Sequence, residues 1–151
     1  MHELAHKFTA IYYGHLAEFR IWYQGILFAL LIGLASFGSV IFAAPGATLI
    51  IPRSIFGLSR KENGIIAAMG PLTNLILGGF FFVLWRNSFN IEFLEVLGMY
   101  GFFINVWLAA FNLIPLFVLD GKKVLSWNII IWLILSIISW SLSIWFILAV
   151  L

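Results

Sequence analysis

The sequence contains no cysteine, and only 9% of its 151 residues are charged. The absence of cysteine excludes disulfide bonds and thiolate metal ligands, so any metal site must use histidine and carboxylate groups. Soluble domains usually carry about 25% charged residues, whereas 64% of this chain is hydrophobic and its mean hydropathy is +1.11. The net charge is only +2 and the basic residues are scattered, which argues against a nucleic-acid partner. We therefore expect a protein that is embedded in the lipid bilayer.

Three uncharged segments are long enough to cross a membrane, which takes about 20 apolar residues. They are Gly64 to Trp85, Val96 to Leu119 and Val124 to Leu151. The sequence shows no internal repeat and no low-complexity tract. The pattern predicts an all-α polytopic membrane protein, with a single membrane-embedded domain over residues 1–151.

The segment from Ile26 to Pro52 has two interpretations. Residues 26–44 are apolar enough for a fourth transmembrane helix. If the basic residues on both sides of the segment are cytoplasmic, however, it must cross an even number of times or not at all, and it is too short for two crossings. β-favouring residues around the Pro45-Gly46 pair indicate a turn. We expect a short re-entrant or interfacial helix and then a membrane-associated β-hairpin at about residues 39–52.

The chain begins with an HExxH motif, His2-Glu3-Leu4-Ala5-His6. Histidines four residues apart lie on one face of a helix, one turn from each other. Both imidazoles can therefore reach one zinc ion, and Glu3 is placed to take a proton from a zinc-bound water. The motif predicts a zinc hydrolase with His2 and His6 as metal ligands and Glu3 as the catalytic base.

Only Met1 precedes this motif, whereas an HExxH helix normally has a preceding turn or more. The first backbone donors of a helix lack partners within the helix, so helix ends fray and hold a ligand poorly. We expect that a preceding segment is missing from this sequence. The alternative is that the protein is naturally shortened.

A third protein ligand is needed to hold zinc while one position stays open for water. Among the acidic residues, only Asp120 ends a long apolar span. Pro115 interrupts the helix before Asp120, and Gly121 permits a sharp turn after it. An ionisable residue at membrane depth is a functional candidate. The alternative is that Asp120 caps the helix at the interface beside Lys122 and Lys123.

Three motifs occur in the order of a known family: HELAH at residues 2–6, Gly70-Pro71-Leu72-Thr73-Asn74, and Asn112-x-x-Pro115-x-x-x-Leu119-Asp120-Gly121. Together they resemble the site-2 protease family of intramembrane zinc metalloproteases, in its archaeal form. The resemblance covers His2 to about Lys123. It implies a core of three helices, a membrane-associated sheet after the first, and Zn2+ held by His2, His6 and Asp120. The family has a helix before HExxH that this sequence lacks.

The resemblance and the site chemistry together predict an intramembrane zinc metalloendopeptidase, multi-pass in the cell membrane, with its active site near the cytoplasmic side. Its partners would be membrane-protein substrates with a transmembrane helix, which must unwind because helical peptide bonds are hidden in hydrogen bonds. The edge of the hairpin could hold the unwound strand, and Asn112 could bind the substrate backbone or the oxyanion. The alternative is an inactive pseudoprotease or fragment that binds membrane proteins.

Overall fold

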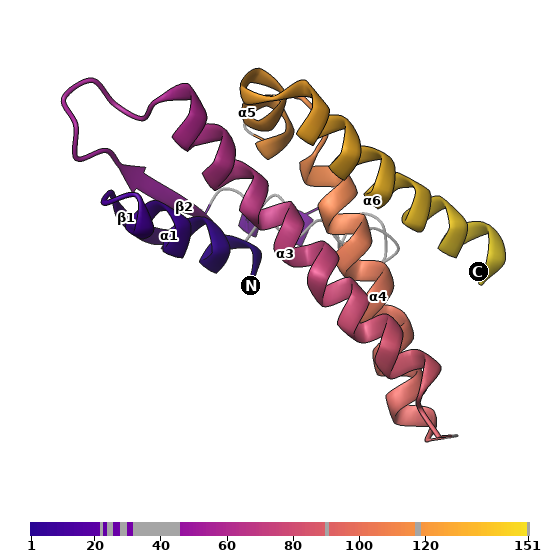
Figure 1. Cartoon of the computed structure of the whole chain (residues 1–151). Helices are drawn as coiled ribbons and strands as arrows, with labels where there is room; N and C mark the ends of the chain where they lie inside the picture. The colour runs from indigo at the N-terminus through magenta and orange to yellow at the C-terminus, as the bar shows by residue number, and fades with distance from the viewer. Residues whose placement is uncertain are drawn as a thin grey trace.

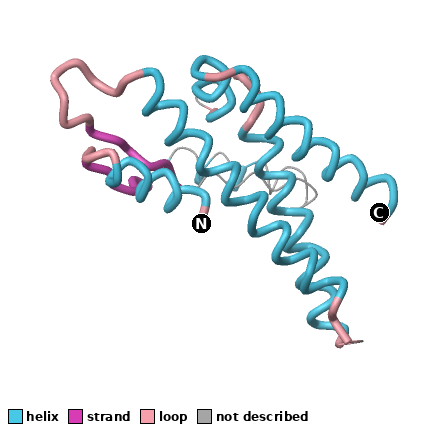
Figure 2. The backbone as a smooth tube through the Cα atoms, in the orientation of Figure 1, coloured by secondary structure: helices cyan, strands magenta, loops and turns pink. Residues whose placement is uncertain are grey.

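The computed structural model describes residues 1–21, 23, 26–27, 30–31, 46–89, 91–116 and 119–150. Its helices and strands are, in chain order, α1 (His2–Tyr12), β1 (Leu16–Ile21), β2 (Gly46–Ile51), α3 (Arg60–Arg86), α4 (Glu92–Asn112), α5 (Asp120–Trp127) and α6 (Ile129–Ala149). Helix α3 contacts α1 along its first half and α4 along its second half, and α6 packs against α4 (Figure 1). The two strands lie beside α1, away from the end of α6 (Figure 2).

Three of the described helices, α3, α4 and α6, are long and apolar enough to cross a membrane. Many of their large apolar side chains are exposed, among them Ile76, Phe80 and Val83 on α3. Contiguous apolar surface of this kind is unfavourable in water and is suited to lipid. The predicted fold class, an HExxH helix followed by about three transmembrane helices, is confirmed.

The second predicted span is shorter in the structure than in the sequence analysis. Helix α4 ends at Asn112, and not at Leu119. Pro115 has no amide hydrogen to donate and its ring disfavours a helical residue before it, so the helix stops before reaching it. The chain is therefore free to turn sharply between the end of α4 and Asp120.

The third predicted span, from Val124 to Leu151, is divided between two helices, α5 and α6. They are separated at Asn128, whose backbone is extended. The Asn128 side chain accepts hydrogen bonds from the backbone amides of Ile130 and Ile131, at 2.9 and 3.1 Å. It therefore caps the start of α6 and stops α5 from continuing into it.

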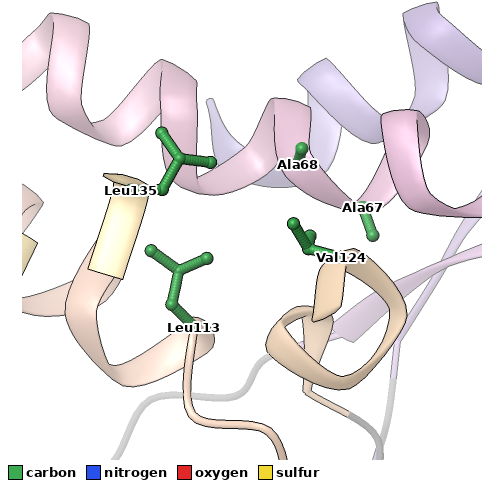
Figure 3. Packing of buried hydrophobic residues seen from close by; sticks show 5 residues of the cluster. All are labelled: Ala67, Ala68, Leu113, Val124 and Leu135. Atoms are coloured by element: carbon green, nitrogen blue, oxygen red, sulfur yellow. The ribbon is translucent and has the colours of Figure 1, made fainter. Parts of the chain in front are cut away.

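A buried cluster holds the short helix α5 against α3 (Figure 3). Its members are Ala67, Ala68, Leu113, Val124 and Leu135. Trp132 adds a hydrogen bond from its indole Nε1 to the Leu113 carbonyl, 2.8 Å long. Gly121 lies so close to Leu113 that a Cβ atom there would overlap the same carbonyl. These contacts fix the beginning of α5, and with it Asp120, next to α3.

The structure contains a small antiparallel sheet of two strands, β1 and β2, which agrees with the predicted presence of a small sheet but not with a hairpin confined to residues 39–52. Residues 46–51 form the second strand, so Gly46 and Ala47 begin a strand and do not form the predicted turn. The partner of β2 is β1, with Leu16 opposite Ile51 and Phe19 opposite Thr48. The other predicted arm, residues 39–42, and most of the predicted re-entrant helix over 26–44 lie outside the described residues.

The contact between α3 and α4 depends on a glycine, which yields a test of the packing. A Cβ atom at Gly98 would lie 2.5 Å from the Trp85 backbone nitrogen, whereas one at Gly79 would meet nothing within 4 Å. Gly98→Ala should lower the free energy of unfolding by about 1–3 kcal/mol, because the helices must separate. Gly79→Ala should be neutral or slightly stabilising, since alanine is the better helix former. Thermal unfolding in detergent measures both, and equal effects would contradict the packing.

Candidate metal centre

Helix α1 carries the HExxH motif and is anchored at its far end. Ala10 is fully buried in a cluster with Ala17 of β1 and Ile66 of α3. The start of the helix has no side-chain cap, and Met1 provides the carbonyl that accepts from the amide of Ala5. Contacts with the sheet and with α3, more than capping, therefore hold the histidines in place.

The structure brings the three predicted metal ligands together. Nε2 of His2 lies 3.0 Å from Oδ2 of Asp120, and Nε2 of His6 lies 3.1 Å from the same oxygen. One ligand atom of each residue lies within 4.8 Å of the others. In a tetrahedral zinc site with ligands at about 2.0 Å, neighbouring ligand atoms are about 3.3 Å apart. The two distances from the histidines to Asp120 are therefore close to those of a zinc site.

Asp120 occupies the first turn of α5 and is not a helix cap. The residue before it, Leu119, holds the N-cap position, and no side chain caps the helix. Burial raises the pKa of Asp120, but its contacts with His2 and His6 outweigh burial, so the pKa lies below the usual range for a carboxyl group. Lys123 adds a positive charge 3.5 Å from the other carboxylate oxygen. These contacts favour the carboxylate form of Asp120, which is the form that binds metal.

The hydrogen bonds of the His6 ring indicate that these residues can hold a cation. Its Nδ1 must donate to the Ile66 carbonyl, 2.7 Å away, because a carbonyl oxygen can only accept. In a neutral imidazole, Nε2 then has a lone pair that faces the Asp120 carboxylate. Two acceptors at 3.1 Å repel each other unless a proton or a metal ion lies between them. The backbone contact to Ile66 is the kind of outer-shell hydrogen bond that orients metal-binding histidines.

Gly70 of α3 provides the surface against which both imidazoles pack. A Cβ atom at this position would lie 2.5 Å from Cε1 and Nε2 of His6 and 2.6 Å from Cε1 of His2. No side chain larger than hydrogen fits there while the rings keep their positions. The glycine in the middle of α3 thus lets the helix approach the ligand atoms.

Glu3, the predicted catalytic base, points towards the sheet. Its Oε2 accepts a hydrogen bond from the amide of Thr48, at 2.8 Å, and its carbonyl accepts from the Thr48 hydroxyl, at 2.9 Å. Glu3 therefore lies at the edge of the ligand group, between the histidines on its own helix and β2. Thr48 was not identified from the sequence, where it was only one residue of a β-favouring run.

Asn112, predicted to bind substrate, is not shown in contact with the ligand group. Its Nδ2 donates to the Leu108 carbonyl of its own helix, at 2.9 Å. This bond uses only one of the two hydrogens on Nδ2. The substrate-binding role stays a prediction, whereas Thr48 and the Ile66 carbonyl are contacts of the site that no sequence motif revealed.

Two histidines and a carboxylate converge in a chain whose described residues include three helices long and apolar enough to cross a membrane, so the class is a membrane-type protein with a candidate metal centre. A protein of Methanocaldococcus jannaschii named "Putative zinc metalloprotease MJ0611" is 43% identical over 136 residues, which cover 90% of this chain and 69% of that protein. "Putative zinc metalloprotease YwhC" of Bacillus subtilis is 31% identical over 140 residues, which cover 83% of this chain and 63% of that protein. No family model and no solved structure matches the chain. The chain belongs to the zinc metalloprotease family of these two proteins.

The tight contact at Gly70 predicts a selective effect on metal binding. Gly70→Ala should push both imidazoles away from Asp120 and lower zinc affinity by at least about tenfold, the scale seen when outer-shell groups are disturbed. Gly79→Ala, on the same helix and with no atom near the added Cβ, is the matched control. Competition with a zinc chelator measures the affinity of each purified variant. Equal affinities would show that α3 does not support the ligands.

Proposed function

We propose that the protein is an intramembrane zinc metalloendopeptidase of the archaeal site-2 protease type, which cleaves transmembrane segments of membrane-anchored proteins. The observation that carries this proposal is the convergence of His2, His6 and Asp120 at one point of a membrane-spanning chain. The names of the two relatives support zinc as the metal and peptide hydrolysis as the reaction. The resemblance of three motifs to the site-2 protease family supports a substrate that lies in the membrane.

His2, His6 and Asp120 would hold the zinc ion, and the Ile66 carbonyl would keep the His6 ring oriented. When bound, zinc acts as a Lewis acid on the scissile carbonyl and lowers the pKa of water towards 7. Glu3 follows His2 by one residue and so points about 100° around the helix from it. It accepts the proton of the attacking water and returns it to the leaving amine.

The depth of the ligand group supports cleavage inside the bilayer. Gly70, which contacts both histidines, follows Arg60 by ten residues of continuous helix, about 15 Å along the axis. A hydrocarbon core is about 30 Å thick, so if the basic start of α3 lies at the surface, the ligands would lie within the half of the membrane next to this basic end. Arg60 and Lys61 begin α3, and Lys122 and Lys123 lie on the neighbouring α5. This basic end would face the cytoplasm in a multi-pass protein of the cell membrane.

The substrate would bind as an extended strand. A transmembrane helix hides its peptide bonds in internal hydrogen bonds, so it must unwind before hydrolysis. Among the described residues the sheet has two strands, so the outer edge of β2 pairs with no other described strand, and Thr48 connects this edge directly to Glu3. Addition of a substrate strand to β2 would place its peptide bonds next to the catalytic base.

The metal assignment is tested with His6→Ala. We expect purified wild-type protein to hold a stoichiometric amount of zinc and the variant to lose it, because two remaining ligands hold the ion weakly. Elemental analysis after dialysis gives the zinc content. His15→Ala is a suitable control, because this buried histidine contacts Glu62 and the Arg53 amide instead. A wild type without zinc, or a His6 variant with as much, would show that the assigned site is wrong.

The catalytic assignment is tested with Glu3→Gln, which keeps the shape of the side chain and removes the base. Zinc should stay bound, while cleavage of a reporter with one transmembrane helix should fall by about 10²–10⁴-fold or more. Glu18→Gln, an exposed carboxylate on β1, controls for the loss of charge. Undiminished cleavage by the Glu3 variant would remove this residue from the mechanism. Wild-type protein that binds zinc but cleaves nothing would favour an inactive relative.

A further inference from the structure

The carboxylate of Glu3 is bound to the strand that is proposed to receive the substrate. Thr48 of β2 donates to it through its backbone amide, at 2.8 Å. The same residue lies opposite Phe19 of β1 in the antiparallel sheet. In such a ladder the amide and carbonyl of a residue face either the partner strand or the opposite edge. Because the Thr48 amide bonds to Glu3, it faces the outer edge of β2.

Successive residues of a strand alternate in the direction of their backbone groups, so the amide of Ile50 faces the same outer edge. A peptide that adds to β2 needs these two amides as donors for its carbonyl oxygens. One of them, that of Thr48, is already bound to Glu3. Substrate and catalytic base therefore compete for one hydrogen-bond donor.

One oxygen of the Glu3 carboxylate is thus held by the sheet, whereas its proposed chemistry takes place at the metal ligands. A base must reach the proton that it accepts, whereas the described contact of this carboxylate is with the sheet and not with His2, His6 or Asp120. We propose that the pair of Glu3 and Thr48 is a latch that the substrate opens. An extended peptide on β2 takes the Thr48 amide, and the freed carboxylate turns towards the metal ligands. This inference rests on the proposed function.

Two features make the exchange feasible without rearranging the fold. The Thr48 amide keeps one acceptor throughout, because a peptide carbonyl oxygen replaces the carboxylate oxygen. The Thr48 hydroxyl keeps its own bond to the backbone carbonyl of Glu3, at 2.9 Å, so the first turn of α1 stays attached to β2. Only the Glu3 side chain has to move. The latch thus holds one oxygen of the base on the sheet until a strand is bound at the edge.

Nuclear magnetic resonance of threonine amides tests the latch directly. The sequence has only three threonines, Thr9, Thr48 and Thr73, so full-length protein labelled with 15N-threonine gives three amide signals. Thr48→Ser identifies the Thr48 signal. The zinc-loaded protein in detergent is titrated with the blocked peptide acetyl-Val-Leu-Val-Leu-Val-amide. The same peptide with alternate N-methyl groups, which cannot pair with a strand edge, is the control ligand.

We expect the Thr48 signal to differ between wild type and Glu3→Ala in the absence of peptide, and to coincide when both are saturated with peptide. In the saturated state the amide is bound to a peptide carbonyl in both proteins. The Glu3 variant should also bind the peptide more tightly, because no carboxylate competes. Glu18→Ala, on the other strand, should match wild type at every step, and the N-methylated peptide should not move the signal.

Three results would overturn the latch: no difference between the unliganded proteins, a difference that persists at saturation, or a Thr48 signal that does not respond to the peptide. Zinc content and reporter cleavage, measured on the same samples, keep the proposed function separate. If cleavage depends on zinc but the Thr48 signal does not respond to the peptide, the latch is refuted and the proposed protease function stands. If the Thr48 signal responds but the protein holds no zinc and cleaves no reporter, the proposed protease function is refuted and the competition for the Thr48 amide stands.

Discussion

The contact of two imidazoles with one oxygen of Asp120 is the interaction on which the rest of the site depends. It joins the first turn of α1 to the start of α5 across more than a hundred residues of sequence. Helix α3 must pass directly behind the rings, which only a glycine at position 70 allows. The chain after α4 must also turn sharply, which requires the end of the helix before Pro115 and a residue without a side chain at Gly121. The packing of the membrane helices is thus organised around a small polar centre.

Much of this could be predicted from the sequence because it is local. The spacing of His2 and His6 fixes their common face on any helix, and the hydropathy pattern locates three spans to within a few residues at most ends. Proline and glycine near Asp120 indicate a broken helix before a turn, which the structure contains. The prediction of Asp120 as third ligand depended on the family motif, because a carboxylate at a helix end beside lysines could also be an interfacial residue.

The remaining features depend on contacts between distant segments, which no local pattern encodes. Strand β1 was not anticipated, because Leu16–Ile21 contains exposed Glu18 and Arg20 and its partner follows after many intervening residues. The break at Asn128 was missed because its flanks are apolar on both sides, and only the side-chain cap reveals it. The hydrogen bond of the Ile66 carbonyl could not be predicted from the sequence, because every residue has a backbone carbonyl. Its role arises from where α3 lies relative to α1.

The apolar setting would couple the proposed metal binding to folding at this site. A carboxylate in a low-dielectric environment is costly unless a cation balances it. Lys123 approaches only one oxygen of Asp120, and the other faces two ring nitrogens. A divalent ion at this point would balance the carboxylate and coordinate both ring nitrogens at once, and it would tie α1 to α5. The same ion would then serve as a link between helices and as the centre of the chemistry, so the ligands cannot be altered for one purpose without affecting the other.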